Sequence, residues 1–301
     1  MTKSKSRKYR FLIWGAKWLP KLLAALSLKN ARRLGAFVGA IGWYLPTTHK
    51  RVTRKNLEIC FPLLSAKERE KLAKRSLIES AKTAAEMGAL CLWEHKRCLE
   101  LVAQTDNERL LDEAIAAKKG VILLAPHLGN WEMMRHFLAS KSAFIALYEV
   151  PKIKELEPLI VATREKAGMI SAPANAKGAA KLFRALGKGA VTAILPDTQP
   201  SKRSGGVFAP LFGVEALTAT FLQKAAQKTG AIVVCGAALR CAEGFTLHFL
   251  EVDQAIYDPD EKVAAAAVNR AIKACINLDL TQYIWEYKRF RARPDGQKRF
   301  Y

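Results

Sequence analysis

Short apolar runs alternate with amphipathic segments through the second half of the chain. An apolar run bounded by turn residues predicts a buried strand, whereas apolar positions repeating every three or four residues predict a helix. Strands and helices in this alternation are typical of an α/β fold, a mainly parallel sheet with helices on both faces. The predicted strands are 121–126, 143–148, 190–195, 231–237 and 245–252, the last antiparallel to its neighbour, and the predicted helices are 133–138, 153–167, 177–186, 216–229 and 261–277.

The first half of the chain has a mostly helical pattern. Ser65 followed by Glu68 matches a capping box, which predicts a helix over 66–93, and a second helix is expected over 107–118. We therefore divide the chain into a basic and apolar N-terminal segment, 1–48, and an α/β domain, 49–301, in which 49–119 is a helical lead-in and 120–301 is the sheet core.

The N-terminal segment offers three interpretations. Lys and Arg precede an apolar stretch at 11–28 that Lys17 and Lys21 interrupt, and a second apolar run, 34–46, is too short to span a bilayer. A cleaved signal peptide is disfavoured because charge breaks the apolar core. A helix pair in a soluble core stays open, as does a tilted span. We favour a monotopic anchor lying in the membrane interface, with basic side chains on anionic headgroups.

Charge sets the class of partner. The 301 residues are 50% hydrophobic, which excludes a disordered chain, and 49 Lys and Arg against 27 Asp and Glu give a formal net charge of +22. Such an excess indicates an anionic partner: nucleic acid, an anionic membrane or an acidic protein. The six cysteines form no Cys-x-x-Cys pair, so reduced thiols and no zinc site are expected.

The segment 127–132, His-Leu-Gly-Asn-Trp-Glu, is the strongest candidate for chemistry, because it lies where a strand feeds a helix. A carboxylate that orients an imidazole makes a general base, so we expect Glu132 to reach back to Nδ1 of His127. Backbone N–H groups near 129–131 are expected to stabilise an oxyanion. Asn130 is the expected N-cap of the helix and also a candidate for substrate binding. The alternative is a core histidine beside a helix-start glutamate.

Three further residues could contact an anionic substrate. Arg164, in a predicted helix, either binds an anion or is an ordinary solvated charge. Asp197 follows a strand at the same sheet edge as His127 and could position substrate, and Lys202 and Arg203 could meet an anion. An ordinary turn and a Gly-rich loop explain the same residues.

Two further stretches each have a functional and a structural interpretation. The apolar segment 207–212 could line an acyl channel or belong to the core. In the C-terminal stretch 282–294, basic residues interleave with aromatic ones. That pattern suits nucleic acid, or a docking face for an anionic carrier or membrane.

In their order and spacing, these motifs resemble the bacterial lipid A biosynthesis acyltransferases, the late or secondary acyltransferase family. The resemblance covers nearly the whole chain. It is carried by His127 to Glu132, by Pro196-Asp197 with Arg203 and the 207–212 segment, and by the 282–294 end.

The resemblance implies an α-β-α sandwich of the glycerolipid acyltransferase type, with an N-terminal helical segment that associates with the membrane. It implies an enzyme on the cytoplasmic face of the inner membrane, which transfers a fatty acyl group from acyl carrier protein to a hydroxyl of an anionic lipid A precursor. His127 and Glu132 match the family's catalytic pair, and Arg164 matches an arginine linked to activity. Neither a cofactor nor a nucleic-acid partner is expected; the acyl carrier protein thioester is the co-substrate.

Two departures from the family pattern concern the acceptor. Glu149 follows Tyr148 where the family commonly has Arg, and Thr198 and Gln199 follow the Pro196-Asp197 turn where His or Gln is commonly next. A different lipid acceptor, such as a lysophospholipid, glycolipid or aminolipid, therefore stays open. A basic membrane-binding or nucleic-acid-binding protein without activity is the non-enzymatic alternative.

Overall fold

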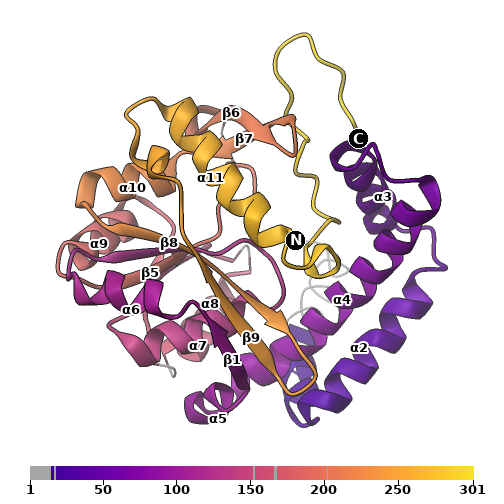
Figure 1. The fold of residues 1–301 in the computed structure, drawn as a ribbon. Helices are drawn as coiled ribbons and strands as arrows, with labels where there is room; N and C mark the ends of the chain where they lie inside the picture. Colours follow the sequence, from indigo (N-terminus) through magenta and orange to yellow (C-terminus); the bar gives the residue numbers. More distant parts are fainter. Residues whose placement is uncertain (1–14, 17, 152, 166–167, 202) are drawn as a thin grey trace, which may run out of the picture.

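The computed structural model describes residues 15–16, 18–151, 153–165, 168–201 and 203–301, and its centre is a five-stranded sheet (Figure 1). The strand order is β1-β9-β8-β2-β5, and every neighbouring pair is parallel except β8 and β9. The strands of this sheet are β1 (Val102–Asp106), β2 (Val121–Leu124), β5 (Val191–Ile194), β8 (Ile232–Arg240) and β9 (Phe245–Leu250). The expectation of a mixed α/β fold with a mostly parallel central sheet is confirmed.

Two strand pairs lie outside this sheet. The parallel pair β3 (Ile145–Tyr148) and β4 (Ile170–Pro173) lies beside the edge strand β5, because Phe144, just before β3, forms a parallel backbone bridge with Val191 of β5. The antiparallel pair is β6 (Gly206–Leu211) and β7 (Val214–Ala219). The helices are α2 (Leu28–Gly42), α3 (Thr48–Cys60), α4 (Ala66–Leu92), α5 (His95–Leu99), α6 (Arg109–Ala116), α7 (Trp131–Lys141), α8 (Glu157–Glu165), α9 (Ala176–Leu186), α10 (Phe221–Thr229) and α11 (Glu261–Ile276), with a short 3₁₀ turn η4 (Leu280–Gln282) near the C-terminus.

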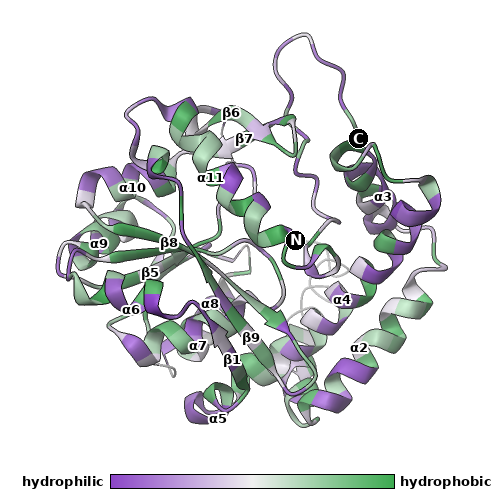
Figure 2. Ribbon diagram, viewed as in Figure 1, coloured by the Kyte–Doolittle hydropathy of each residue, from purple (hydrophilic) through white to green (hydrophobic). Residues whose placement is uncertain are grey.

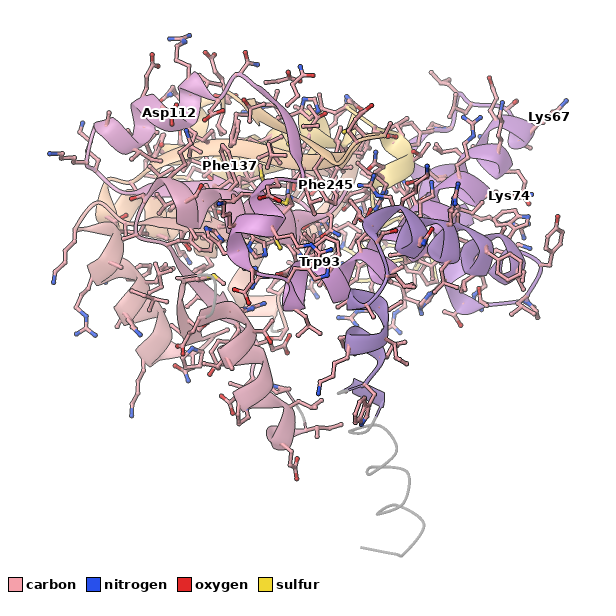
Figure 3. The ribbon with its side chains drawn as sticks, turned by 90° about the horizontal axis from the view of Figure 1, so that it is seen from below. Lys67, Lys74, Trp93, Asp112, Phe137 and Phe245 are labelled. Carbon is pink, nitrogen blue, oxygen red and sulfur yellow. The ribbon has the colours of Figure 1, made fainter. Side chains whose placement is uncertain are left out.

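Both faces of the central sheet are covered, as the apolar strands predict. Successive side chains of β2 point to opposite faces. Ile122 and Leu124 belong to a core shared with α9, α10 and α11, whereas Val121 and Leu123 belong to a second core shared with α6 and α7. Figure 2 shows hydrophobic residues concentrated along these strands, and Figure 3 shows Phe137 and Phe245 inside, with Lys67 and Lys74 at the surface of α4.

Helix α2 has its small residues inside and its bulky apolar residues outside. Gly35 and Gly39 face α4 so closely that a Cβ on either would lie within 2.8 Å of α4 backbone. The opposite face exposes bulky apolar side chains at helical spacing, which are Leu34, Phe37, Val38 and Ile41. A helix on the surface of a soluble domain normally shows the reverse arrangement.

Helix α4 begins at Ser65 and Glu68 with the predicted capping box. No described helix is long and apolar enough to cross a membrane. The basic residues of the segment before residue 15, together with Lys17 and Lys202, lie outside the described residues.

Two predictions about elements are wrong. The expected helix over 216–229 begins only at Phe221, because Val214–Ala219 pairs with β6 as strand β7. The hairpin closes with a two-residue turn, Phe212 and Gly213. Both residues have positive φ (52° and 78°), as the type I′ turn of a β-hairpin requires. The lead-in 49–119 was expected to be helical, but it contains β1, a half-exposed edge strand whose apolar pattern is correspondingly weak.

Candidate active site

The imidazole of His127 is held by a buried carboxylate from another strand end. Nδ1 of His127 lies 2.8 Å from Oδ1 of Asp197, and the backbone N–H of His127 donates to Oδ2 at 2.9 Å. Strands β2 and β5 are parallel neighbours, so the loops that follow them meet at one sheet edge. The Asp197 side chain is fully buried, whereas that of His127 is 22% exposed.

The expected contact between Glu132 and Nδ1 of His127 is wrong. Glu132 lies in the first turn of α7, where Oε2 is 3.1 Å from Nε of Arg135, one helical turn further on. Its other oxygen lies 4.0 Å from Nη2 of Arg164, on α8. Glu132 therefore faces two arginines, and Nδ1 has its partner in Asp197. The prediction that Arg164 lies in a helix is confirmed.

Asp197 and His127 shift each other's pKa. Burial would lower the pKa of His127, but the charge and hydrogen bond of Asp197, with a smaller contribution from Glu132, raise it above its ordinary value. Burial would raise the pKa of Asp197, but His127 and the backbone hydrogen bonds lower it. An ionised Asp197 fixes the proton of neutral His127 on Nδ1, which leaves Nε2 as the basic nitrogen. Within the described part of the chain, Nε2 has no hydrogen-bond partner.

The backbone after His127 is fixed by close packing. Gly129 has φ of +61°, and a Cβ there would lie 2.0 Å from the carbonyl oxygen of Ala238 in β8. The N–H groups of Gly129 and Asn130 donate to the carbonyls of Gln282 and Ala238, at 3.0 and 2.9 Å. These two N–H groups are therefore not available to an oxyanion, contrary to the prediction. The N–H groups of Trp131 and Glu132, in the first turn of α7, remain as candidates.

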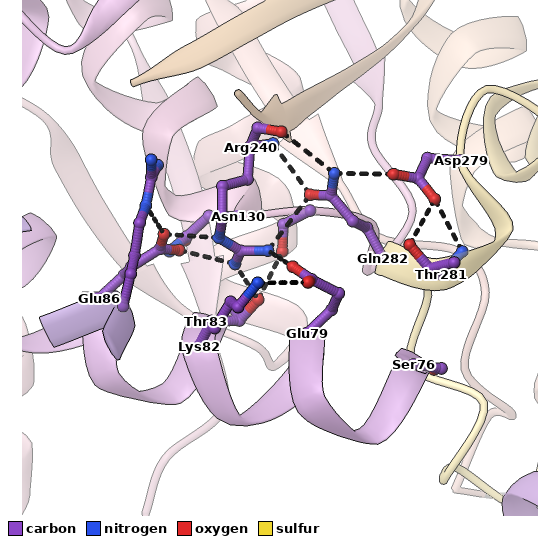
Figure 4. Close-up of polar contacts among 12 residues, drawn as sticks. Ser76, Glu79, Lys82, Thr83, Glu86, Asn130, Arg240, Asp279, Thr281 and Gln282 are labelled. Atoms are coloured by element: carbon purple, nitrogen blue, oxygen red, sulfur yellow. Dashed lines mark hydrogen bonds and ion pairs between the residues drawn. The ribbon is translucent and has the colours of Figure 1, made fainter. Parts of the chain in front are cut away.

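A buried charge network supports this loop (Figure 4). Glu86 of α4 is fully buried and accepts hydrogen bonds from Nε of Arg32, at 2.6 Å, and from Nε and Nη2 of Arg240, at 2.6 and 2.8 Å. Its Oε2 also accepts from Nδ2 of Asn130, at 3.0 Å. Burial would raise the pKa of Glu86, but the two arginines and Asn130 lower it. Oγ1 of Thr83, in the same helix, donates to the carbonyl of Gly129 at 3.1 Å.

The network explains where Asn130 belongs. Asn130 is the N-cap residue of α7, as predicted, but its side chain makes no capping hydrogen bond and donates to Glu86 instead.

Residue Arg135 could have been inferred as the partner of Glu132 from the i, i+3 spacing. The local pattern does not predict the partners of Glu86 and Arg240. Each is a single charged residue within an apolar stretch, however, and such a residue indicates a buried charge that needs a partner.

Much of the C-terminal stretch 282–294 lies in the core. Tyr283, Trp285, Arg289 and Phe290 are buried, and Nη1 of Arg289 donates to the carbonyl of Leu217 at 2.7 Å. The apolar segment 207–212 forms most of β6 and ends in the hairpin turn at Phe212, with Ala209 and Leu211 in the core. Arg203 is exposed and forms an ion pair with Asp295 at 3.1 Å.

Comparison with known proteins assigns the chain to a family. The model of a family described as bacterial lipid A biosynthesis acyltransferase matches residues 2–292. The chain belongs to this family. A lipid A biosynthesis lauroyltransferase of Escherichia coli (strain K12) is 27% identical over 294 residues, 95% of this chain and 93% of that protein. A lipid A biosynthesis palmitoleoyltransferase of the same strain is 29% identical, over 89% of this chain and 87% of that protein.

A third relative extends the comparison to another organism. A lipid A biosynthesis acyltransferase of Haemophilus influenzae (strain ATCC 51907 / DSM 11121 / KW20 / Rd) is 23% identical over 95% of this chain and 92% of that protein. Membership of a lipid A acyltransferase family confirms that the chain is an acyltransferase. The His127–Asp197 pair is the site at which general-base chemistry is best supported by the geometry.

Proposed function

We propose that this lipid A acyltransferase moves a fatty acyl group from an acyl carrier protein thioester to a hydroxyl of a lipid A precursor, with His127 as the general base. The observation that carries the proposal is the 2.8 Å contact between Nδ1 of His127 and buried Asp197. A histidine held in this way can take a hydroxyl proton on Nε2. The activities named for the relatives, which include lipid A lauroyl and palmitoleoyl transferases, support the acyl group and the lipid.

The proposed step balances without a covalent enzyme intermediate. Nε2 of His127 takes the proton of the acceptor hydroxyl as the hydroxyl oxygen attacks the thioester carbonyl carbon. The carbon–sulfur bond then breaks, and the leaving sulfur takes the proton from the imidazolium. Asp197 stabilises the imidazolium while it exists, since both are largely removed from water. The N–H groups of Trp131 and Glu132 are our candidates for donors to the oxyanion.

We assign Glu132 and Arg164 to the substrate side of the site. Glu132 contributes negative charge near His127, and its carboxylate lies 3.1 Å from Arg135 and 4.0 Å from Arg164. Arg164 is 25% exposed, so part of its guanidinium faces solvent and can bind a carbonyl or phosphate oxygen of a substrate.

We further propose that the enzyme works at the cytoplasmic face of the inner membrane, with α2 lying in the interface. The outward face of α2 carries Phe37, which is 64% exposed, and the same surface continues to Tyr44, which is 76% exposed. Lys21 and Lys29 lie nearby in the sequence, and a bulky apolar face beside cations suits an anionic bilayer surface.

The activity is tested by mass spectrometry of the product. The full-length protein is incubated with acyl carrier protein that carries a labelled acyl group and with a purified lipid A precursor. We expect one acyl group to be added by the wild type and none by His127→Ala. Transfer to a lysophospholipid or aminolipid alone would favour the altered acceptor, which exposed Glu149 keeps open. Transfer by His127→Ala at the wild-type rate would contradict the proposed base.

The membrane proposal is tested by flotation with vesicles that contain anionic phospholipid. The double variant Phe37→Ser and Ile41→Ser is expected to lose binding. A matched double variant, Val263→Ser and Leu278→Ser, removes exposed apolar side chains from α11 and the residues just after it and is expected to float as the wild type does. Equal flotation of all three proteins would contradict the role of α2.

A further inference from the structure

A basic cavity lies beside the loop that carries Asp197. Its volume is about 700 Å³, which is in the range of sites for small ligands. Its walls come from three segments: the loop after β5, residue Leu217 of β7, and the C-terminal stretch from Lys288 onward. The charged residues that line it are Arg203, Lys288, Arg291, Arg293, Arg299 and a single acid, Asp295.

Most of these cations lack an acidic partner. Asp295 pairs with Arg203, and among the residues the structure describes no carboxylate forms an ion pair with Lys288, Arg291 or Arg299. Arg293 uses its Nη atoms on the carbonyl of Glu215 and the side chain of Gln297, and its Nε is buried without a partner. The cavity therefore concentrates positive charge that the described part of the protein leaves unbalanced.

A neighbouring basic cavity shows the opposite arrangement. It measures about 730 Å³, shares Tyr301 as a wall, and is lined mainly by α3. Its cations are largely occupied: Arg54 pairs with Glu70, Lys55 pairs with Glu58 at 3.0 Å, and Nζ of Lys50 donates to the carbonyl of Trp43. The two cavities have similar sizes, but only the one beside Asp197 has mostly uncommitted cations.

Gln199 joins the basic cavity to the active-site loop. It lines the cavity and lies two residues after Asp197. Its backbone N–H donates to Oη of Tyr287 at 2.9 Å, its Nε2 donates to the carbonyl of Arg289 at 2.6 Å, and its Oε1 accepts from the N–H of Ala292. The segment that carries the cations is thus fixed to the same loop as the residue that orients His127.

We propose that this cavity binds a phosphate group of a substrate while the reacting part of that substrate lies at His127. Arginine-rich concave sites match phosphate oxygens in charge and in hydrogen-bond geometry. The inference rests on the proposed function, which supplies two sources of phosphate: the acceptor glycolipid and the phosphopantetheine arm of the donor. A macromolecule that docked through charge alone would need a far larger surface than one cavity.

The test removes the two uncommitted arginines and varies the phosphates. The double variant Arg291→Ala and Arg299→Ala is expected to raise KM about tenfold for the substrate whose phosphate it binds, with kcat within about twofold. Each variant is assayed with the acceptor before and after phosphatase treatment, and with acyl-phosphopantetheine against acyl-pantetheine. The increase is expected to vanish in the arm that lacks the phosphate, and the arm in which it vanishes identifies the source.

A matched variant controls for net charge. The double variant Lys119→Ala and Arg184→Ala also removes two exposed cations. Lys119 follows α6 and Arg184 lies in α9, and both helices lie away from the C-terminal end (Figure 1). It is expected to match the wild type in every arm. If the Arg291 and Arg299 variant raises KM only for intact acyl carrier protein, and equally with and without phosphate on the small substrates, the cavity docks a protein and the proposal is wrong. An effect no greater than that of the control also contradicts it.

Binding without turnover separates this proposal from the proposed function. Retention of phosphorylated and phosphatase-treated lipid A precursor by the immobilised full-length protein requires no acyl transfer. We expect the phosphorylated lipid to be retained more strongly, and the Arg291 and Arg299 variant to lose that preference. A wild type that transfers no acyl group but keeps the preference would contradict the proposed function alone.

Discussion

Two carboxylates lie near His127, and they differ in burial and in the groups that they contact. Asp197 is fully buried, comes from the next strand of the sheet and contacts Nδ1 of His127. Glu132 is five residues from His127 in the chain, is partly exposed, and faces Arg135 and Arg164. Nearness in sequence therefore does not decide which carboxylate orients the histidine; the pairing of β2 with β5 does.

The largest expected effect comes from Asp197→Asn. The amide cannot hold Nδ1–H in the same way or stabilise the imidazolium, so kcat should fall by about 10³- to 10⁴-fold. Steady-state acyl transfer measures the fall, and an unchanged thermal midpoint shows that the fold is intact. A fall of less than about tenfold would mean that Asp197 is not the orienting carboxylate.

The next effect concerns the loop between His127 and Glu132, which the Glu86 network supports. Glu86→Gln removes the charge that Arg32 and Arg240 share inside the protein, which should lower the free energy of unfolding by about 3–5 kcal/mol. Urea denaturation followed by circular dichroism measures this change. The control is Glu113→Gln, whose ion pair with Arg109 is exposed and should contribute less than about 1 kcal/mol. Equal losses would show that the network is not structurally important.

Glu132→Gln should have a smaller effect on catalysis than Asp197→Asn. It removes a charge that helps to raise the pKa of His127 and leaves Arg135 and Arg164 without their shared carboxylate. We expect kcat/KM to fall about 10- to 100-fold, mostly through KM if Arg164 binds substrate. A loss as large as that of Asp197→Asn would reverse the comparison.

The smallest effect is a shift in pH dependence. The base works when His127 is neutral, so kcat/KM should fall as pH drops through the pKa of His127, and this midpoint should lie above the ordinary value of about 6.5. Removing a nearby negative charge lowers that pKa. The midpoint should therefore move to lower pH in Asp197→Asn and by less in Glu132→Gln. A larger shift in Glu132→Gln would contradict the assignment.

The sequence predicts what depends on local pattern and misses what depends on pairing between distant segments. The strand before His127, the helix after it and the Ser65 capping box all follow from periodicity and turn residues. Strand β1 was missed because an edge strand has a weak apolar pattern, and β7 because its apolar residues also fit a helix. Asp197 was recognised as a residue of the same sheet edge, but its contact with His127 depends on the order of strands.

The buried network was missed for a related reason. Glu86, Arg240 and Asn130 come from α4, β8 and the loop before α7, so their contacts depend on tertiary packing that no local pattern encodes. The basic cavity likewise joins the loop after β5 to the C-terminal stretch. In the sequence, Arg203 and the interleaved basic residues of 282–294 were separate weak signals.

The most direct test of the account is the protonation state of His127, observed by NMR with ¹⁵N-labelled histidine. His127→Gln assigns its signals among the five histidines. At a pH above the raised pKa of His127, we predict a neutral imidazole with its proton on Nδ1, in a hydrogen bond that survives in Glu132→Gln and is lost in Asp197→Asn. A Nδ1–H signal that survives in Asp197→Asn and is lost in Glu132→Gln would contradict the central claim that Asp197 orients the base.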